Sequence, residues 1–389
     1  MTDLIVDRQD ESSGPIGRLL RSARTPQGRT SDFTAIWVLV IFANVFGLVM
    51  ILSASSVMSL YSTGSPWSQF LKQAGWFVIG ATVMFIASRF AYQRLPRYTT
   101  YLLGAATVLM ILALLPGIGV SVNGASRWIG LGEFRIQPSE LVKLVVILYV
   151  AVTLSRRSTH LHDWKVSIRP VLVVFAWFAL LLMKQPNLGT TIILASIVLV
   201  MLFVGGAPLK PLGAVVALLI AGATALAVTE GYRMRRLTAF MDPWADPLNA
   251  GMQTIQSQVA FANGGLVGAG IGRGRAQWGF LPEAHTDFIY AIIGEETGLL
   301  GSLFVIALVI ALTMFGVRTA MRAPDRLGML LATGITAWIA VQAIINLGAC
   351  VGVMPITGVP LPFLSAGGSS LIFTMAAAGV LANIARQER

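Results

Sequence analysis

The sequence has few charged residues, and this scarcity decides its class. Only 12% of its 389 residues are Asp, Glu, Lys or Arg, whereas 56% are hydrophobic, and the mean hydropathy is +0.76. A soluble globular domain is about one-quarter charged. The composition therefore excludes a soluble protein and predicts an integral membrane protein.

Cysteine is almost absent, and acidic residues are fewer than basic ones. The single cysteine, Cys350, excludes a disulfide framework and a cysteine-rich metal site, and we expect it to be a small buried residue. The net charge is +11, from 28 basic and 17 acidic residues. In a membrane protein such an excess is typical of a basic cytoplasmic face attracted to anionic lipid. We therefore expect membrane lipid, and no nucleic acid, as a partner.

The apolar residues form runs of helix length, since a helical span takes roughly 20 apolar residues. They do not form the short alternating segments of an outer-membrane barrel. We predict an all-α integral membrane protein whose polytopic domain is 32–389. It has about ten transmembrane helices, with a large extracytoplasmic loop at about 231–287 between the seventh and eighth. The predicted spans are 35–55, 72–90, 99–119, 139–155, 169–184, 188–206, 211–230, 288–317, 327–349 and 367–385.

The charges outside the spans predict the orientation. Residues 1–31 form a polar, arginine-containing tail that we expect to be disordered and cytoplasmic, without the apolar core of a signal peptide. Ten spans place both termini on the cytoplasmic side, where most loop arginines and lysines then lie, as the positive-inside rule requires. The exception is a cluster after the seventh span, which indicates either a boundary error or a site for an anionic partner: Arg233, Arg235 and Arg236.

Titratable residues crowd the stretch 281–298, LPEAHTDFIYAIIGEETG. Glu283, His285 and Asp287 precede an apolar helix start, and Glu295 and Glu296 follow it. Ionisable groups at membrane depth are costly and commonly functional. The alternative is a solvated helix cap, with Thr286 or Asp287 capping the first turn.

A second group of charges lies around the outside loop 117–139. The loop holds Arg127 and Arg135, and the following span begins with Pro138, which suits a helix start. Glu140 and Lys143 are three residues apart, hence on one helix face and able to pair. Such a pair is functional if it points into a cavity. The alternative is that the two charges only neutralise each other at a helix end.

Two further outside segments are candidates for substrate contacts. The loop 231–287 is long, and long loops are usually functional; its part 252–263 predicts a short amphipathic helix, and its glycines an irregular turn. In 352–370, prolines force non-helical backbone, and the start of the last helix offers Ser369 and Ser370 as a cradle for an anion. The alternative is a tight re-entrant turn. Gln342 and Asn346, four apart in a span, predict interhelical hydrogen bonds.

Several motifs, in this order, resemble the SEDS family (shape, elongation, division, sporulation), which polymerises peptidoglycan from lipid II. They cover the chain from about Asp32 to its end and include NGASRWI, QPSELVK, QPNLGTT, DPWADP with GMQTIQSQ, LPEAHTDFIYAIIGEETG and LPFLSAGGSS. PEAHTDFI and DPW look more like the division branch, FtsW, than the elongation branch, RodA. One departure is Ala366, where the family usually has tyrosine.

The resemblance implies an activity and partners. It implies ten spans, an essential outside acid at the position of Asp287, roles for Arg127, Glu140 and Lys143, and an outside loop that holds lipid II. It also implies a class B penicillin-binding protein as partner, with other divisome proteins. The expected location is the bacterial inner membrane, at the division septum.

The mechanism expected is transfer of a sugar from a lipid pyrophosphate to the 4-hydroxyl of another. Asp287 is the expected general base, and direct attack would invert the anomeric centre and release undecaprenyl pyrophosphate. Cations neutralise the leaving group. The sequence assigns no definite cofactor, and a divalent cation, Mg²⁺ or Mn²⁺, would suit this role. The substrate-binding candidates are Arg127, Glu140, Lys143, Lys184, Arg233, Arg235, Arg236, Glu283, His285, Ser369 and Ser370.

Two other functions fit the same sequence. A lipid II flippase would need a charge-lined path across the bilayer, whereas the charges here gather near the outer face. A non-catalytic divisome scaffold would use the outside loops for docking and would tolerate loss of Asp287.

Overall fold

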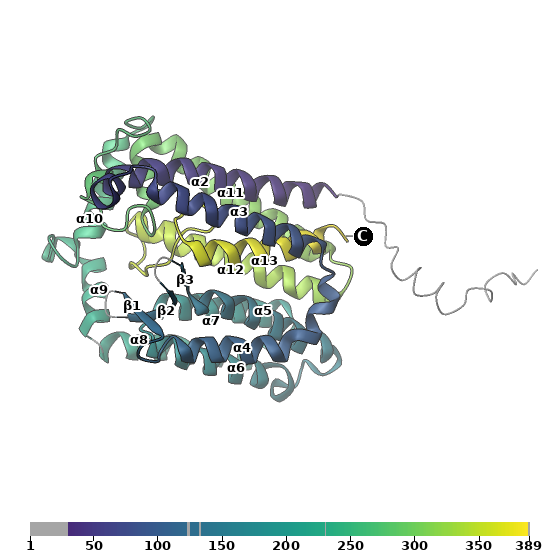
Figure 1. Ribbon diagram of the computed structural model, residues 1–389. Helices are drawn as coiled ribbons and strands as arrows, with labels where there is room; N and C mark the ends of the chain where they lie inside the picture. Colours follow the sequence, from purple (N-terminus) through teal and green to yellow (C-terminus); the bar gives the residue numbers. More distant parts are fainter. Residues whose placement is uncertain (1–29, 123–124, 132–133, 230, 388–389) are drawn as a thin grey trace, which may run out of the picture.

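The structure is a computed structural model that describes residues 30–387, except 123–124, 132–133 and 230. All but the last two residues of the predicted tail, 1–31, lie outside this range. The described chain forms a bundle of roughly parallel helices, and both described ends of the chain lie at the same end of the bundle (Figure 1). We call this the terminal end and the opposite one the loop end.

Each predicted span contains a helix, but the span predicted at 99–119 is too long, because its helix ends at Leu112 and Gly119 begins a strand. The bundle helices are α2 (Ser31–Thr63), α3 (Ser68–Arg89), α4 (Thr99–Leu112), α5 (Pro138–Arg156), α6 (Trp164–Lys184), α7 (Leu188–Val204), α8 (Leu209–Thr229), α11 (Ile289–Arg322), α12 (Arg326–Cys350) and α13 (Gly368–Ala385). By length and composition, eight helices among the described residues could cross a membrane, α4 being extended by the 3₁₀ turn η1 (Tyr92–Tyr98). The apolar helices Leu188–Val204 and Leu209–Gly222 are shorter. The all-α membrane fold is confirmed, and the count of ten crossings stays a prediction.

Some of the bundle helices begin at capping side chains. Thr30 accepts a hydrogen bond from the amide of Phe33 at the start of α2, and Asp325 accepts one from Gly328 at the start of α12. Asn187 caps α7 in the same way. These caps supply hydrogen-bond acceptors to amides that have no partner inside the helix. They therefore help to define the residues at which these helices begin.

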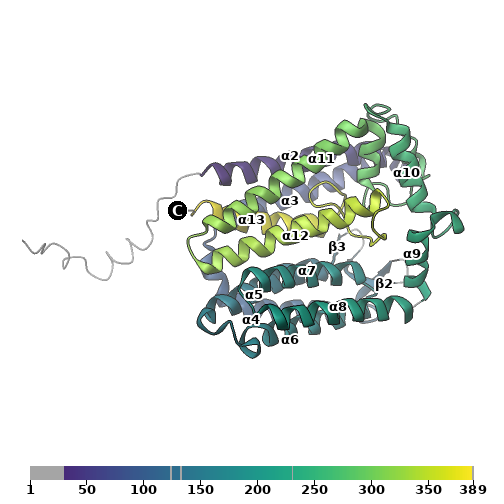
Figure 2. The ribbon, with the colours of Figure 1, turned by 180° about the vertical axis from the view of Figure 1, so that it is seen from behind.

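The core lies along α5, α12 and α13. About 72%, 78% and 67% of their most apolar windows are buried inside the bundle, against 17% for α3. α12 packs on α5, α7 and α11, and α13 packs on α3 (Figure 2). The site-bearing ends of α11 and α12 are therefore supported by the best-packed part of the molecule.

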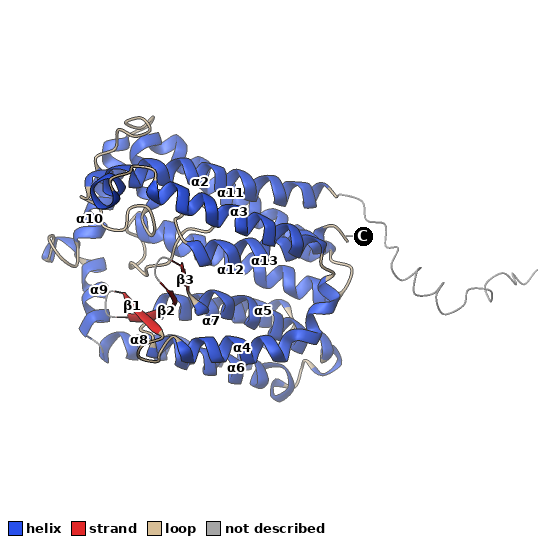
Figure 3. Ribbon diagram, viewed as in Figure 1, coloured by secondary structure: helices blue, strands red, loops and turns tan. Residues whose placement is uncertain are grey.

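The loop end carries structure of its own (Figure 3). α9 (Gly231–Met241) and α10 (Met252–Gly264) lie there, and α10 confirms the short helix predicted at 252–263, whereas α9 was not predicted. The loop 117–139 contains an antiparallel sheet in the order β1 (Gly119–Val122), β2 (Ala125–Leu131), β3 (Phe134–Ile136). Strands were not expected in a segment so rich in turn residues. Two 3₁₀ turns, η3 (Pro243–Ala245) and η4 (Ala276–Trp278), complete the long loop, and a third, η2 (Ser158–His160), lies between α5 and α6.

Candidate functional site

Asp287 lies in the turn that leads into α11 at the loop end. The amide of Asp287 donates to the carbonyl oxygen of Glu283 at 3.1 Å. The carbonyl oxygen of Asp287 accepts hydrogen bonds from Asn346 Nδ2 at 2.8 Å and from Cys350 Sγ at 3.5 Å, both on α12. Its main chain is thus fixed, and within the described part of the chain no side chain donates a hydrogen bond to its carboxylate.

The alternative of a helix cap is wrong. The residue that caps α11 is Phe288, and no side chain accepts a hydrogen bond there. Thr286 instead donates to the carboxylate and carbonyl oxygens of Glu283, at 2.9 and 3.1 Å. Glu283 itself is exposed and has a positive φ of 57°, an uncommon conformation for a residue with a side chain.

The segment 352–367 passes over Asp287, held by two amide side chains of α12. Asn346 also donates to the carbonyl oxygen of Val359 at 2.8 Å, and Gln342 donates to that of Pro360 at 2.9 Å. A Cβ atom on Gly358 would lie 3.5 Å from Asp287 Oδ2, and Gly358 has a φ of +70°. Glycine therefore allows the loop to approach the carboxylate.

Two arginines from distant parts of the chain face Asp287. Arg236 on α9 donates to the carbonyl oxygen of Ile356 at 3.1 Å. Arg127 on β2 donates from Nε to the carbonyl oxygen of Gln185 at 2.9 Å and from Nη2 to that of Pro186. Main-chain carbonyls thus orient both guanidinium groups.

These surroundings set the acidity of Asp287. Burial raises the pKa of its carboxyl and the charge of Glu283 raises it further, while Arg236 and Arg127 lower it, so that the pKa is about 6. A carboxylate with this pKa is deprotonated at neutral pH, yet is more basic than an ordinary aspartate. It is suited to accept a proton from a hydroxyl.

His285 joins the same turn to the loop above it. Its carbonyl oxygen accepts a hydrogen bond from the amide of Ala366 at 2.9 Å. Burial lowers the pKa of its half-buried imidazole, so the ring is neutral at pH 7. Its main chain positions the turn, and a proton-transfer role for the ring stays a prediction.

Glu140 and Lys143 form a buried ion pair on α5. The carboxylate and ammonium are 2.8 Å apart, and the two residues are 3% and 0% exposed. Lys143 Nζ also donates to Gln342 Oε1 at 2.9 Å and lies 4.6 Å from the ring centre of Trp338. Neither charged group reaches solvent here, so the geometry fits the self-neutralising alternative. Gln342 nonetheless links the pair to the loop above Asp287, and it makes the interhelical bond predicted for it.

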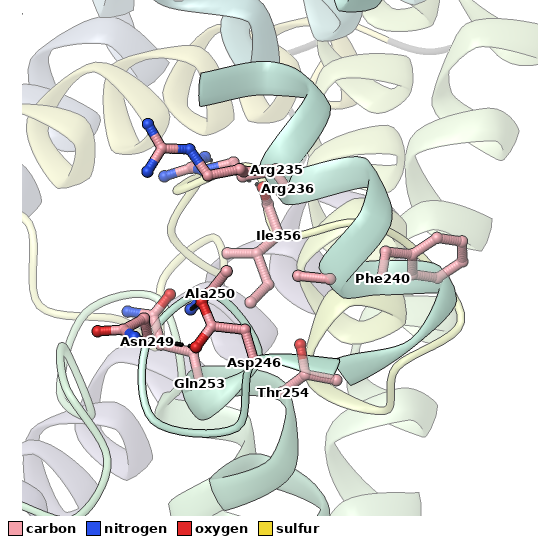
Figure 4. Close-up of a pocket in the computed structure, with 10 residues that line it drawn as sticks. Arg235, Arg236, Phe240, Asp246, Asn249, Ala250, Gln253, Thr254 and Ile356 are labelled. Atoms are coloured by element: carbon pink, nitrogen blue, oxygen red, sulfur yellow. Dashed lines mark hydrogen bonds between the residues drawn. The ribbon is translucent and has the colours of Figure 1, made fainter. Parts of the chain in front are cut away.

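A cavity of about 290 Å³ opens beside α9. Figure 4 shows Arg235 and Arg236 side by side with their guanidinium groups pointing the same way, and Asp246 and Asn249 on another wall. The cavity is lined by Arg235, Arg236, Ala239, Phe240, Asp246, Asn249, Ala250, Gln253, Thr254 and Ile356. α9 lies at the loop end, as the outside position of the arginine cluster requires (Figure 1). The side chain of Arg233 lies outside the described residues.

The remaining candidates lie apart from this cavity. Lys184 is exposed at the end of α6, next to the carbonyl that holds Arg127. Ser369 is buried and its hydroxyl accepts a hydrogen bond from the amide of Gln137 at 3.1 Å, whereas Ser370 is half-buried. A Cβ atom on Gly368 would meet Trp76 of α3 at 2.4 Å. The start of α13 is therefore packed as in the alternative re-entrant turn, and substrate contacts by the two serines stay a prediction.

A divalent cation has no ready-made ligand set in the described chain. Among those residues no three His, Cys, Asp or Glu side chains come together in an arrangement that could hold a metal ion. Asp287 and a substrate pyrophosphate would have to supply most of the oxygen ligands. The site instead offers the guanidinium groups of Arg235 and Arg236 to a pyrophosphate. These cations would neutralise its negative charge as a metal ion would.

The sequence singled out two amide side chains of α12 but did not predict that they hold the loop above Asp287. Gln342 binds the carbonyl of Pro360 as well as Lys143 of α5. Asn346, by contrast, donates to the carbonyls of Asp287 and Val359 and, among the described residues, not to a neighbouring helix, so the interhelical bond predicted for Asn346 is wrong. The available signal was two amide side chains on one face of an apolar helix. Nothing in that spacing says that the partner is a loop.

Comparisons with known proteins agree with this architecture. The FtsW/RodA/SpoVE family model, described as "Cell cycle protein", matches residues 33–389. The probable peptidoglycan glycosyltransferase FtsW of Geobacter metallireducens is 39% identical over 350 residues, which cover 90% of this chain and 93% of the relative. The stage V sporulation protein E of Bacillus subtilis is 37% identical over 362 residues, which cover 93% of this chain and 99% of the relative.

Solved structures match as well. A structure described as "Structural coordination of polymerization and crosslinking by a peptidoglycan synthase complex" contains a chain with a TM-score of 0.74 and 28% identity, covering 90% of this chain and 96% of that one. The rod shape determining protein RodA of Thermus thermophilus has a TM-score of 0.67 and 26% identity, covering 91% and 96%. From its sequence, its helices and its site-bearing loops, the chain belongs to the FtsW/RodA/SpoVE family of multi-pass membrane proteins.

Proposed function

We propose that the chain is a peptidoglycan glycosyltransferase that polymerises lipid II into glycan strands, with Asp287 as general base. The observation that carries the proposal is the carboxylate of Asp287, raised to a pKa of about 6 and faced by Arg236 and Arg127. The names of the relatives and the description of the synthase complex support the reaction class.

The proposed reaction follows from these groups. Asp287 accepts the proton of the acceptor sugar's 4-hydroxyl as its oxygen attacks the anomeric carbon of the donor. The bond to the pyrophosphate oxygen breaks, undecaprenyl pyrophosphate departs with the electron pair, and the anomeric centre is inverted. The guanidinium groups of Arg235 and Arg236 stabilise the departing pyrophosphate, since arginine matches phosphate oxygens with paired donors.

The site is proposed to face the extracytoplasmic side. The arginines predicted to be inside include Arg94 in η1, Arg157 after α5 and Arg326 at the start of α12, and these segments form the terminal end. Asp287 directly precedes the start of α11, which lies at the loop end. Lipid II would then be used after it has been flipped. A class B penicillin-binding protein that cross-links the product, and a place at the division septum, complete the proposal.

The test uses the purified full-length chain, lipid II and a gel that resolves glycan chains, with and without the partner. We expect Asp287→Asn to lower the polymer yield about 10²–10⁴-fold, and Asp163→Asn, which removes an acid at the terminal end, to match the wild type. Full polymer yield from Asp287→Asn would refute the general base. Lipid II transfer across vesicles without polymer would instead favour the flippase, and partner binding with neither activity would favour the scaffold.

A further inference from the structure

α11 consists of two helical segments that are joined across a kink at Gly298. Gly298 has φ 68° and ψ −162°, which no helical residue adopts, and it separates an outer segment, 289–297, from the long inner segment. The outer segment follows Asp287 almost directly. Whatever fixes the position of this segment therefore also constrains Asp287, the proposed general base.

The loop 264–276 occupies the break. The amides of Ala269 and Gly270 donate to the carbonyl oxygens of Glu295 and Glu296, at 2.9 and 3.0 Å. On the inner side of the break, the amide of Leu299 donates to the carbonyl oxygen of Gly265 at 2.9 Å. The loop thus pairs with carbonyl and amide groups that the interrupted helix leaves without helical partners.

Two buried carboxylates hold the same loop from the side. Glu295 and Glu296 are each 1% exposed. Glu295 accepts hydrogen bonds from the amides of Arg275 and Ala276, one on each oxygen, at 2.9 and 3.0 Å. Hydrogen bonds to a charged acceptor are the strong ones, and a buried acceptor left without its donors is costly.

Glu296 ties the loop to α2 as well. Ser53 Oγ lies 2.6 and 2.7 Å from the two carboxylate oxygens of Glu296, to which it donates, and it accepts a hydrogen bond from the amide of Gly272 at 3.0 Å. In the part of the chain that the structure describes, no lysine or arginine forms an ion pair with Glu295 or Glu296. Directed hydrogen bonds, which depend on the path of the loop, therefore hold these carboxylates in place.

The loop 264–276 packs so closely on the outer segment of α11 that its main chain has no room to take another path. A Cβ atom on Gly268 would lie 2.2 Å from the carbonyl oxygen of Glu296, and one on Gly298 would lie 2.4 Å from the amide nitrogen of Gly268. A Cβ atom on Gly274 would lie 2.8 Å from Glu295 Oε2. The loop and the outer segment form one tightly packed unit.

We propose that Glu295 and Glu296 are positioning residues that lock the loop 264–276 onto the outer segment of α11 and so fix Asp287 against its arginines. The inference rests on the proposed function of Asp287. The outer segment is then held at both ends, by Asn346 at the Asp287 carbonyl and by the locked loop at the break. A small shift of a catalytic group is costly because the reacting atoms must be closely aligned.

The experiment compares Glu295→Gln with Asp287→Asn and with Asp163→Asn, a control at the terminal end, in the full-length protein with its partner. Hydrogen–deuterium exchange follows the peptides of the loop, and lipid II polymerisation gives kcat and KM. For Glu295→Gln we expect loop exchange about tenfold faster and kcat about tenfold lower, because one strong hydrogen bond is lost, with KM within about twofold. Asp287→Asn should keep the loop protected.

Each other outcome overturns a distinct claim. Faster loop exchange with an unchanged kcat would mean that the lock does not position Asp287, and a lower kcat with unchanged exchange would mean that Glu295 acts by another route. Activity in Asp287→Asn would refute the proposed function and leave the lock as a structural finding. If Glu295→Gln does not fold, Gly268→Ala provides the second variant, since it displaces the loop without removing an acid.

Discussion

The two ends of the bundle use a buried acid in opposite ways. At the terminal end Asp32 is fully buried, and its carboxylate pairs with Arg318 Nε at 2.9 Å and Arg322 Nη1 at 3.6 Å. At the loop end Asp287 is only half-buried, and the nearby Arg236 bonds the main chain. An acid in a close ion pair fastens helices together, whereas an acid whose cations are held at a distance keeps its basicity.

The largest difference between the two ends is expected when each aspartate, Asp287 and Asp32, is replaced by asparagine. Asp287→Asn should lower polymerisation about 10²–10⁴-fold, the usual contribution of a general base. It should not lower the melting temperature, because it removes a half-buried negative charge. Asp32→Asn should keep most of the activity and lose about 1–3 kcal/mol of stability, since its arginines are partly exposed.

Thermal melting and the polymerisation assay on the same samples check this pair of variants. If Asp287→Asn unfolds more readily than Asp32→Asn, the division of roles between the two ends is wrong.

Removing the anchor of Asp287 should have the next largest effect. Asn346→Ala deletes the donor to two carbonyl oxygens, that of Asp287 and the buried one of Val359. We expect kcat to fall about tenfold with little change in KM, because the acid moves while the substrate contacts remain. A rise in KM at constant kcat would show that Asn346 serves binding instead.

Removing a facing cation should lower the maximal rate, because a group that stabilises the departing pyrophosphate is lost, and it should also change the pH dependence. Arg236 lowers the pKa of Asp287, so Arg236→Gln should move the acid limb of the pH–rate profile to higher pH. The rate then falls more at pH 6 than at pH 8. Arg235→Gln, one position away on α9, is the matched comparison, and it should also lower the maximal rate but should not move the limb, because Arg235 is not among the charges that act on the pKa of Asp287. Equal profiles for both variants would refute the electrostatic role of Arg236.

The smallest effect is expected at Lys184. Its exposed ammonium lies beyond direct contact with the acid, so Lys184→Gln should raise KM only about twofold, and salt should mask the difference. A large loss at high salt would mean that Lys184 touches the substrate.

The sequence predicted the helices well and the site in part. Long apolar runs can only become helices in a bilayer, so the spans followed from composition, and the motif around Asp287 pointed to the acid. The sheet in 119–136 and the helix α9 could not be predicted, because short polar elements are decided by packing rather than by periodicity. The break at Gly298 was not predicted either, since the long apolar run that begins at Leu299 gives no sign of an interruption before it.

The burial of the Glu140–Lys143 pair was equally out of reach. Spacing shows that the two residues share a helix face, but it does not show which helix covers that face. The covering residues, Trp338 and Gln342, are some 200 positions away in the chain. Only the assembled bundle reveals that the pair supports a loop.

The pH dependence of kcat/KM for the wild type tests the central claim most directly, because kcat/KM reports the ionisations of the free enzyme. A base must be deprotonated to act, so log kcat/KM should rise with unit slope up to about pH 6 and level off above it, in line with the pKa of Asp287. A profile that stays flat well below pH 6, down to the range of an ordinary aspartate, would contradict the account.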